Sequence, residues 1–337
     1  MANFYYGGQA VIEGVMMRGR TSVAMALRRI DGSIYLYEEP LPPRLYQNRL
    51  LRLPLLRGMF LLWETLVLGS RLMSLSGNVA IGDAQVSAPP FEAGSEPAAK
   101  GEQSVALPPL PEKPAQGGGV TLILPLLVSL GFVIVIFFLG PLFVTSLLRN
   151  WIGDGWLSLT LEGVIRLALL LGYLYLIGRV PDIQRVFGYH GAEHKAINAM
   201  EQGEPLDVAH VRQASRVHTR CGTGFLLLVV VISIFVFALV GSPSLIIKVL
   251  SRILLVPVVA GVAYELMRLG ATNYRYRVVR WLLTPGLALQ GLTTREPDDS
   301  MIECAIMALQ RVMFHDKPQS TTNEHGSPTE PPLALSQ

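Results

Sequence analysis

Four long apolar stretches separate the polar parts of this chain. They span residues 120–148, 157–177, 222–240 and 245–266, and the first and third contain no charged residue. Each is long enough to cross a hydrocarbon layer of about 30 Å, which takes roughly 20 helical residues. The pattern therefore predicts a mainly α-helical, polytopic membrane protein with about four transmembrane helices.

Two of these stretches carry charges that need an explanation. Glu162 and Arg166 lie four residues apart, which places them on one helix face, where they can neutralise each other. Lys248 and Arg252 lie near the start of the fourth stretch. We expect their long side chains to reach the nearer membrane surface.

The region before the first stretch mixes strand and helix patterns. Alternating residues in 21–27, an Asp-Gly pair and a second run at 34–37 predict a hairpin. The glycines of 7–19 predict a strand with tight turns and close backbone packing. Residues 50–76 are helical in pattern but rich in charge, which favours an interfacial or re-entrant helix. A fifth span there is the alternative, and it would invert the N-terminal topology.

Composition marks two segments as linkers and places one more helix. Proline, alanine, glycine, glutamate and serine dominate 82–119, which predicts a disordered linker, and the end of the chain is similar. Ser300 and Glu303 resemble a capping box and predict a helix over 301–314. The expected organisation is a mixed α+β N-terminal region (1–81), the linker (82–119), the transmembrane core with a His-rich loop and a C-terminal helix (120–315), and a disordered tail (316–337).

Charge sets the expected orientation and partners. Only 16% of the 337 residues are charged, against about 25% in soluble domains. The net charge of +3 comes without a basic run interleaved with aromatics, which excludes nucleic acid as a partner. Basic residues gather in 179–220 and 268–280. Both termini and the His-rich loop are therefore expected in the cytoplasm, with the cell (inner) membrane as the location and the lipid bilayer as a partner.

The His-rich loop carries the most specific chemistry. His190 and His194 lie four residues apart on one helix face, within reach of one cation, and Glu193 lies between them. The pattern His-x-x-Glu-His is that of the inverzincin peptidases, in which the histidines bind zinc and the glutamate is the general base. Such a site needs a third ligand further along the chain. Glu265 is a candidate, although a salt bridge to Arg268 would also explain it.

A second pair, His218 and Cys221, also has chelating spacing. His190, His194, His218 and Cys221 together could close a tetrahedral zinc site, which would be structural. A site with three protein ligands and Glu193 as base would be catalytic, because catalytic zinc keeps a position for water. Both arrangements remain open at this point, as does a simple packing role for the cysteine.

Four blocks of the sequence resemble those of the YqhQ-like family of bacterial membrane proteins. The blocks are 7–19, 189–195, 218–223 and 285–306. The pattern departs at Thr219, where the family commonly has proline. The resemblance covers nearly the whole chain and implies a multi-span protein described as a predicted metal-dependent enzyme.

The leading hypothesis is a cytoplasm-facing, membrane-embedded metal-dependent enzyme, expected to be a hydrolase of unknown substrate. Its cofactor would be a divalent metal, with zinc expected, and Glu193 would activate the bound water. The alternative is a non-catalytic scaffold or assembly factor with a structural metal site. A third hypothesis, metal transport, would need Glu162 and Glu265 as ligands along the spans.

Overall fold

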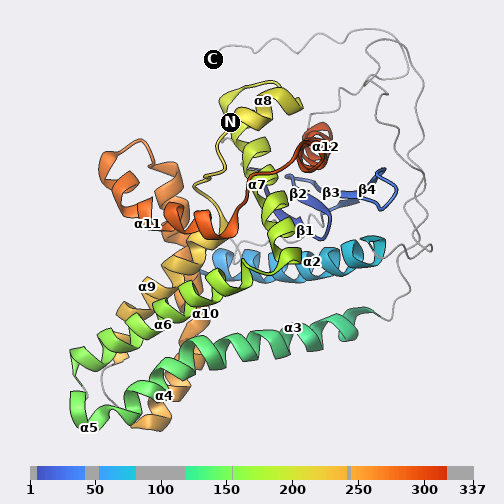
Figure 1. Ribbon diagram of the computed structural model, residues 1–337. Coiled ribbons are helices and arrows are strands. Elements are labelled where there is room, and N and C mark those ends of the chain that lie inside the picture. The colour runs from blue at the N-terminus through green and yellow to red at the C-terminus, as the bar shows by residue number, and fades with distance from the viewer. Residues whose placement is uncertain (1–5, 42–52, 81–117, 154, 241–243, 317–337) are drawn as a thin grey trace, which may run out of the picture.

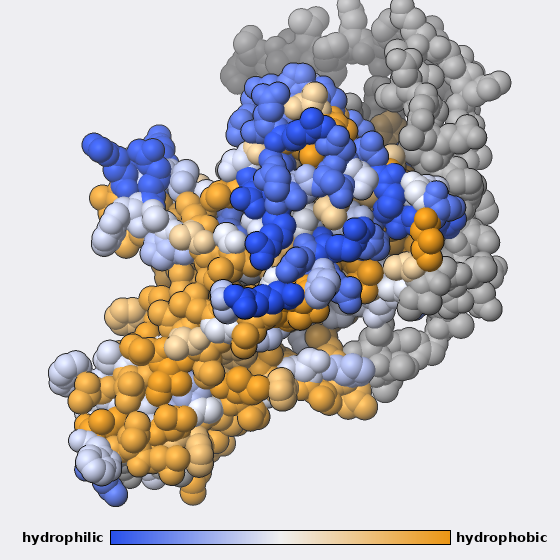
Figure 2. Space-filling model, in the orientation of Figure 1, coloured by the Kyte–Doolittle hydropathy of each residue, from blue (hydrophilic) through white to orange (hydrophobic). Residues whose placement is uncertain are grey.

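The chain folds into a helical body and a second body that contains a β-sheet (Figure 1). The surface of the helical body is the more hydrophobic of the two (Figure 2). The computed structural model describes residues 6–41, 53–80, 118–153, 155–240 and 244–316. Within them, five helices are long and apolar enough to cross a membrane: Leu56–Ala80, Leu124–Leu147, Trp156–Ile177, Gly222–Val240 and Ile246–Thr272. The chain is thus a mainly helical, multi-pass membrane protein. The count exceeds the predicted four by the N-terminal helix.

The four strands form one antiparallel sheet in the order β1-β2-β3-β4. Their bounds are β1 Gly7–Val11, β2 Gly14–Arg18, β3 Ser22–Arg28 and β4 Ile34–Pro40. The predicted hairpin is confirmed, because β3 pairs with β4 from Arg28↔Ile34 to Ser22↔Pro40. The glycine-rich segment forms the β1–β2 hairpin, with its tight turn at Ile12 and Glu13. Glu13 has a φ of 56° there.

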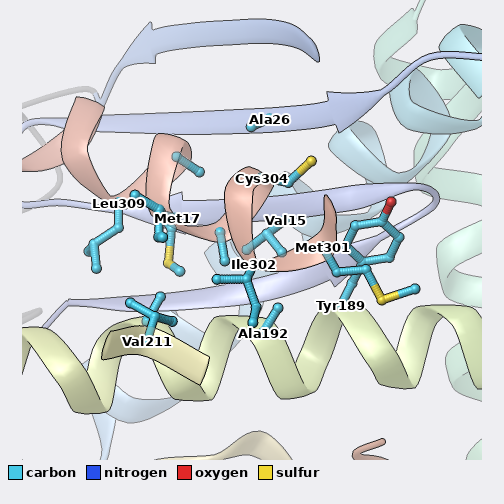
Figure 3. Packing of buried hydrophobic residues seen from close by; sticks show 14 of the residues in the cluster. Val15, Met17, Ala26, Tyr189, Ala192, Val211, Met301, Ile302, Cys304 and Leu309 are labelled. Atoms are coloured by element: carbon cyan, nitrogen blue, oxygen red, sulfur yellow. The ribbon is translucent and has the colours of Figure 1, made fainter. Parts of the chain in front are cut away.

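Helices cover both faces of the sheet. One face packs against α7 (Pro181–Gln202) and α12 (Asp299–Asp316), and the other against α2 (Leu56–Ala80). Strand side chains alternate between the two faces, so each strand supplies both cores. Figure 3 shows the first core, with its labelled residues drawn from the sheet, α7, α8 (Val208–Gln213) and α12: Val15, Met17, Ala26, Tyr189, Ala192, Val211, Met301, Ile302, Cys304 and Leu309. The sheet is therefore completed by helices far away in the sequence.

The transmembrane body is built from the remaining long helices. Figure 2 shows its surface as largely hydrophobic below the polar part. Its elements are α3 (Gly118–Ile134), a π-helical turn η2 (Val135–Leu139), α4 (Gly140–Leu147), α5 (Arg149–Ile152), α6 (Trp156–Ile177), α9 (Gly222–Val240) and α10 (Leu245–Thr272). An amphipathic helix α11 (Arg277–Thr293) follows α10. The sequence patterns above did not predict α11.

A buried ion cluster joins α6, α9 and α10. Glu162 accepts hydrogen bonds from Nη2 of Arg166 at 2.7 Å and from Nη2 of Arg252 at 2.8 Å. Arg166 also donates to Ser233 Oγ and to the carbonyl of Phe137 in η2. The predicted pair is confirmed. The expectation that Arg252 reaches the membrane surface is wrong, because this side chain is 1% exposed and turned inward. A shared carboxylate compensates the cost of burying it.

The start of α12 also differs from its prediction. The carboxylate of Asp298 accepts from the backbone N–H of Met301 at 3.0 Å, which is the contact of an N-cap residue. Ser300 is already inside the helix, and Glu303 pairs with Arg28. The prediction of a capping box at Ser300 and Glu303 is therefore wrong, and the N-cap lies two residues earlier, at Asp298. The predicted linker and tail lie outside the described residues except at 118–119 and 316.

Candidate metal centre

The His-x-x-Glu-His segment lies in the middle of α7, which is fixed at both ends. Pro181 lies in its first turn, where the backbone N–H that proline lacks would have no hydrogen-bond partner within the helix. Gly203 ends it with a φ of 77°, a conformation that favours glycine. A Cβ at Gly191 would collide with the carbonyl oxygen of Arg295. The helix can therefore lie directly against the segment that precedes α12.

Backbone carbonyls orient both imidazole rings. Nδ1 of His190 lies 2.9 Å from the carbonyl oxygen of Thr293, and Nδ1 of His194 lies 2.5 Å from that of Arg216. A carbonyl only accepts, so each Nδ1 carries the proton. Each Nε2 then keeps its lone pair for another partner. This arrangement is typical of histidines that ligate metals.

Three potential ligand atoms converge beside these rings. The ligand atoms of His190, His194 and Cys221 all lie within 4.8 Å of one another. Sγ of Cys221 is 3.4 Å from Nε2 of His190. The cysteine immediately precedes α9, and the N–H of Thr223 donates to its sulfur at 3.4 Å. Two imidazoles and a thiolate suit zinc, so the donor set fits the predicted metal.

Glu193 lines the same cavity as these ligands. The cavity has a volume of about 90 Å³ and is also bordered by Gly8 of β1 and by Arg220. Burial raises the pKa of the Glu193 carboxyl, although the nearby His190 and a hydrogen bond from the backbone N–H of Gly8 oppose that rise. A carboxyl beside the ligands, with its affinity for a proton increased, can exchange a proton with a small molecule in the cavity.

His218 borders the cavity without joining the three converging ligands. Its ring centroid is 5.5 Å from that of His194, and its Nε2 is buried with no hydrogen-bond partner among the described residues. Burial lowers its pKa. The side-chain amide of Gln290 holds its backbone, accepting from the N–H at 2.9 Å and donating to the carbonyl at 2.7 Å. Its ring nitrogens would have to move toward the other three ligand atoms to make it a fourth ligand.

Glu265 has a different environment. Its carboxylate pairs with Arg57 of α2, so it does not belong to the converging group, and the partner is not the Arg268 considered above. Glu162, the other acid required by the transport hypothesis, pairs with two arginines.

Sequence patterns missed the residues that support the site. Thr293, Arg216 and Gln290 act through backbone carbonyls or a side-chain amide, and neither kind of role leaves a spacing pattern. Gly8 belongs to the glycine-rich block that was noticed, yet its place beside Glu193 depends on how β1 packs on α7. A Cβ there would meet the carbonyl oxygen of Met16 and the side chain of Glu193.

Comparison with known proteins finds one matching family and one similar protein. The family described as "Protein of unknown function (DUF1385)" matches residues 53–315. The "Uncharacterized protein YqhQ" of Bacillus subtilis (strain 168) is 35% identical over 312 residues, which cover 91% of this chain and 92% of that protein. No solved structure matches the chain.

Proposed function

The chain belongs to the DUF1385 family, and we propose that this member is a membrane-embedded, metal-dependent enzyme, most simply a hydrolase. Its metal ligands would be His190, His194 and Cys221, and Glu193 would be its general base. The observation that carries the proposal is the convergence of three ligand atoms within 4.8 Å, in a cavity that Glu193 also lines.

Each residue has a defined task in this proposal. The carbonyls of Thr293 and Arg216 hold the two imidazoles with Nε2 toward the cavity. Zinc, when bound, would polarise a water molecule and lower its pKa. Glu193 would take the proton from that water and return it to the leaving group. The burial of Glu193, 5% exposed, supports this role because it favours the protonated form between the two transfers.

Metal analysis of the purified protein tests the ligand set. We expect about one equivalent of zinc in the wild type and its loss in His190→Ala, His194→Ala and Cys221→Ala. His210→Ala and Cys304→Ala are matched controls, because neither residue belongs to the converging group. Wild-type protein with less than about a tenth of an equivalent of transition metal would refute the site.

A structural metal site is the second candidate, and His218 is the observation that favours it. Nε2 of His218 makes no hydrogen bond among the described residues and lies 3.8 Å from the Glu201 carboxylate, so it could supply a fourth ligand. The protein would then act as a scaffold or assembly factor. The absorption spectrum of cobalt-substituted protein distinguishes a three-ligand catalytic site from a four-ligand structural site. If His218→Ala leaves the spectrum unchanged, an open site is supported. If Glu193→Gln keeps both the metal and the cellular function, the general-base role is excluded.

The location of the site relative to the membrane is part of the proposal. The basic residues in the connection between α6 and α9 support a cytoplasmic site in the inner membrane. Both termini are then cytoplasmic provided that α2 lies along the membrane surface and only the other four long apolar helices cross it. Protease protection of tags at both termini, in inverted and right-side-out vesicles, tests this orientation. Tags that are digested only in right-side-out vesicles would contradict it.

A further inference from the structure

The helix α11 exposes a strip of large apolar side chains. Val278, Trp281 and Leu282 are 68%, 75% and 63% exposed. Their spacing of three and four residues places them on one helix face. An exposed apolar strip with a tryptophan is typical of a helix at the boundary between lipid headgroups and acyl chains.

Residues further along α11 contact the transmembrane helices. Gly286 lies on Gly224 of α9, where an added Cβ would be 3.5 Å from the Cα of Gly224. Leu283 packs on Gly270 near the end of α10. These contacts hold α11 beside the ends of two spans, so its exposed strip lies where a leaflet surface would meet the protein.

Arginines gather around the same strip. Arg275, Arg277 and Arg280 are exposed, and none of them forms an ion pair with a carboxylate among the residues that the structure describes. Arg268 is also exposed and lies near Glu265, whose carboxylate binds Arg57. Other exposed arginines differ: Arg212, for example, pairs with Asp299. The result is a positively charged rim on an apolar surface. Figure 2 shows polar residues beside hydrophobic ones at the α11 side of the molecule.

We propose that α11 and the turn before it bind anionic phospholipids of the adjoining leaflet. The phosphates accept hydrogen bonds from the arginines, and the apolar strip enters the acyl boundary. Charge complementarity selects anionic over zwitterionic lipid, because each basic residue near such a surface contributes roughly a factor of five in affinity. The apolar strip selects lipid over free phosphate. This proposal does not depend on the metal centre.

Native mass spectrometry of the full-length protein, titrated with phosphatidylglycerol or phosphatidylcholine, tests the proposal. We expect tighter retention of phosphatidylglycerol, and in Arg277→Gln/Arg280→Gln a loss of about 25-fold in that affinity alone. The matched control is Arg20→Gln/Arg29→Gln, which removes the same charge from the sheet and should change nothing.

Three results would overturn the proposal. The first is equal retention of the two lipids by the wild type. The second is an equal loss in the test and control variants. The third is displacement of phosphatidylglycerol by millimolar inorganic phosphate, which would identify a simple anion site. Metal content is measured separately, so none of these outcomes bears on the metal ligands.

Discussion

Glu162→Gln is expected to destabilise the transmembrane body far more than its small change in shape suggests. The wild-type carboxylate is 3% exposed and is shared by Arg166 and Arg252, each 1% exposed. The amide has almost the same volume, so no cavity forms. Two buried guanidinium groups lose the only carboxylate that they contact among the described residues.

The expected loss is about 3–5 kcal/mol of unfolding free energy, the cost of leaving a buried charge without its partner. A matched control is Glu303→Gln, which removes a carboxylate paired with Arg28 at 2.6 Å but 48% exposed. An exposed pair contributes about 0–1 kcal/mol. Each variant deletes one carboxylate that binds arginine, so the difference between the two losses of unfolding free energy measures the effect of burial.

Equilibrium unfolding in mixed micelles, followed by circular dichroism, measures both losses. Adding Arg252→Met to Glu162→Gln should recover part of the stability, because it removes one of the unpaired charges. The reasoning fails if the two single variants lose the same amount, or if the double variant is less stable than Glu162→Gln alone.

Three further predictions concern the site and the core around it. Gln290→Leu should leave zinc affinity unchanged at the proposed three-ligand site, and should lower it about 10-fold or more if His218 is a fourth ligand, because it releases the backbone of His218; isothermal titration with zinc measures this, and a 10-fold loss would favour the four-ligand structural site. Gly191→Ala should cost about 1–3 kcal/mol of unfolding free energy through a backbone collision, whereas Gly172→Ala, which meets nothing within 4 Å, should cost none; equal unfolding midpoints would contradict this. Cys304 should resist iodoacetamide at pH 8 until the protein unfolds, because burial raises the pKa of its thiol to about 12; modification of the folded protein, detected by mass spectrometry, would disprove it.

The sequence by itself determined the features that depend only on residues close together in the chain. The apolar length of the spans, the alternation in β3 and β4 and the four-residue spacing of His190 and His194 are all repeated patterns in neighbouring residues. The same holds for the pair Glu162–Arg166, which one turn of helix brings together.

Only the tertiary structure decided which distant groups meet. The third potential ligand atom beside His190 and His194 belongs to Cys221 and not to Glu265, because α9 begins beside α7 while Arg57 of α2 binds the Glu265 carboxylate. Arg252 turns inward because Glu162 lies opposite it on α6. The carbonyls that orient the histidines are present in every residue, so no spacing could select Thr293 or Arg216. Such contacts follow from packing across the chain, and a linear pattern does not record them.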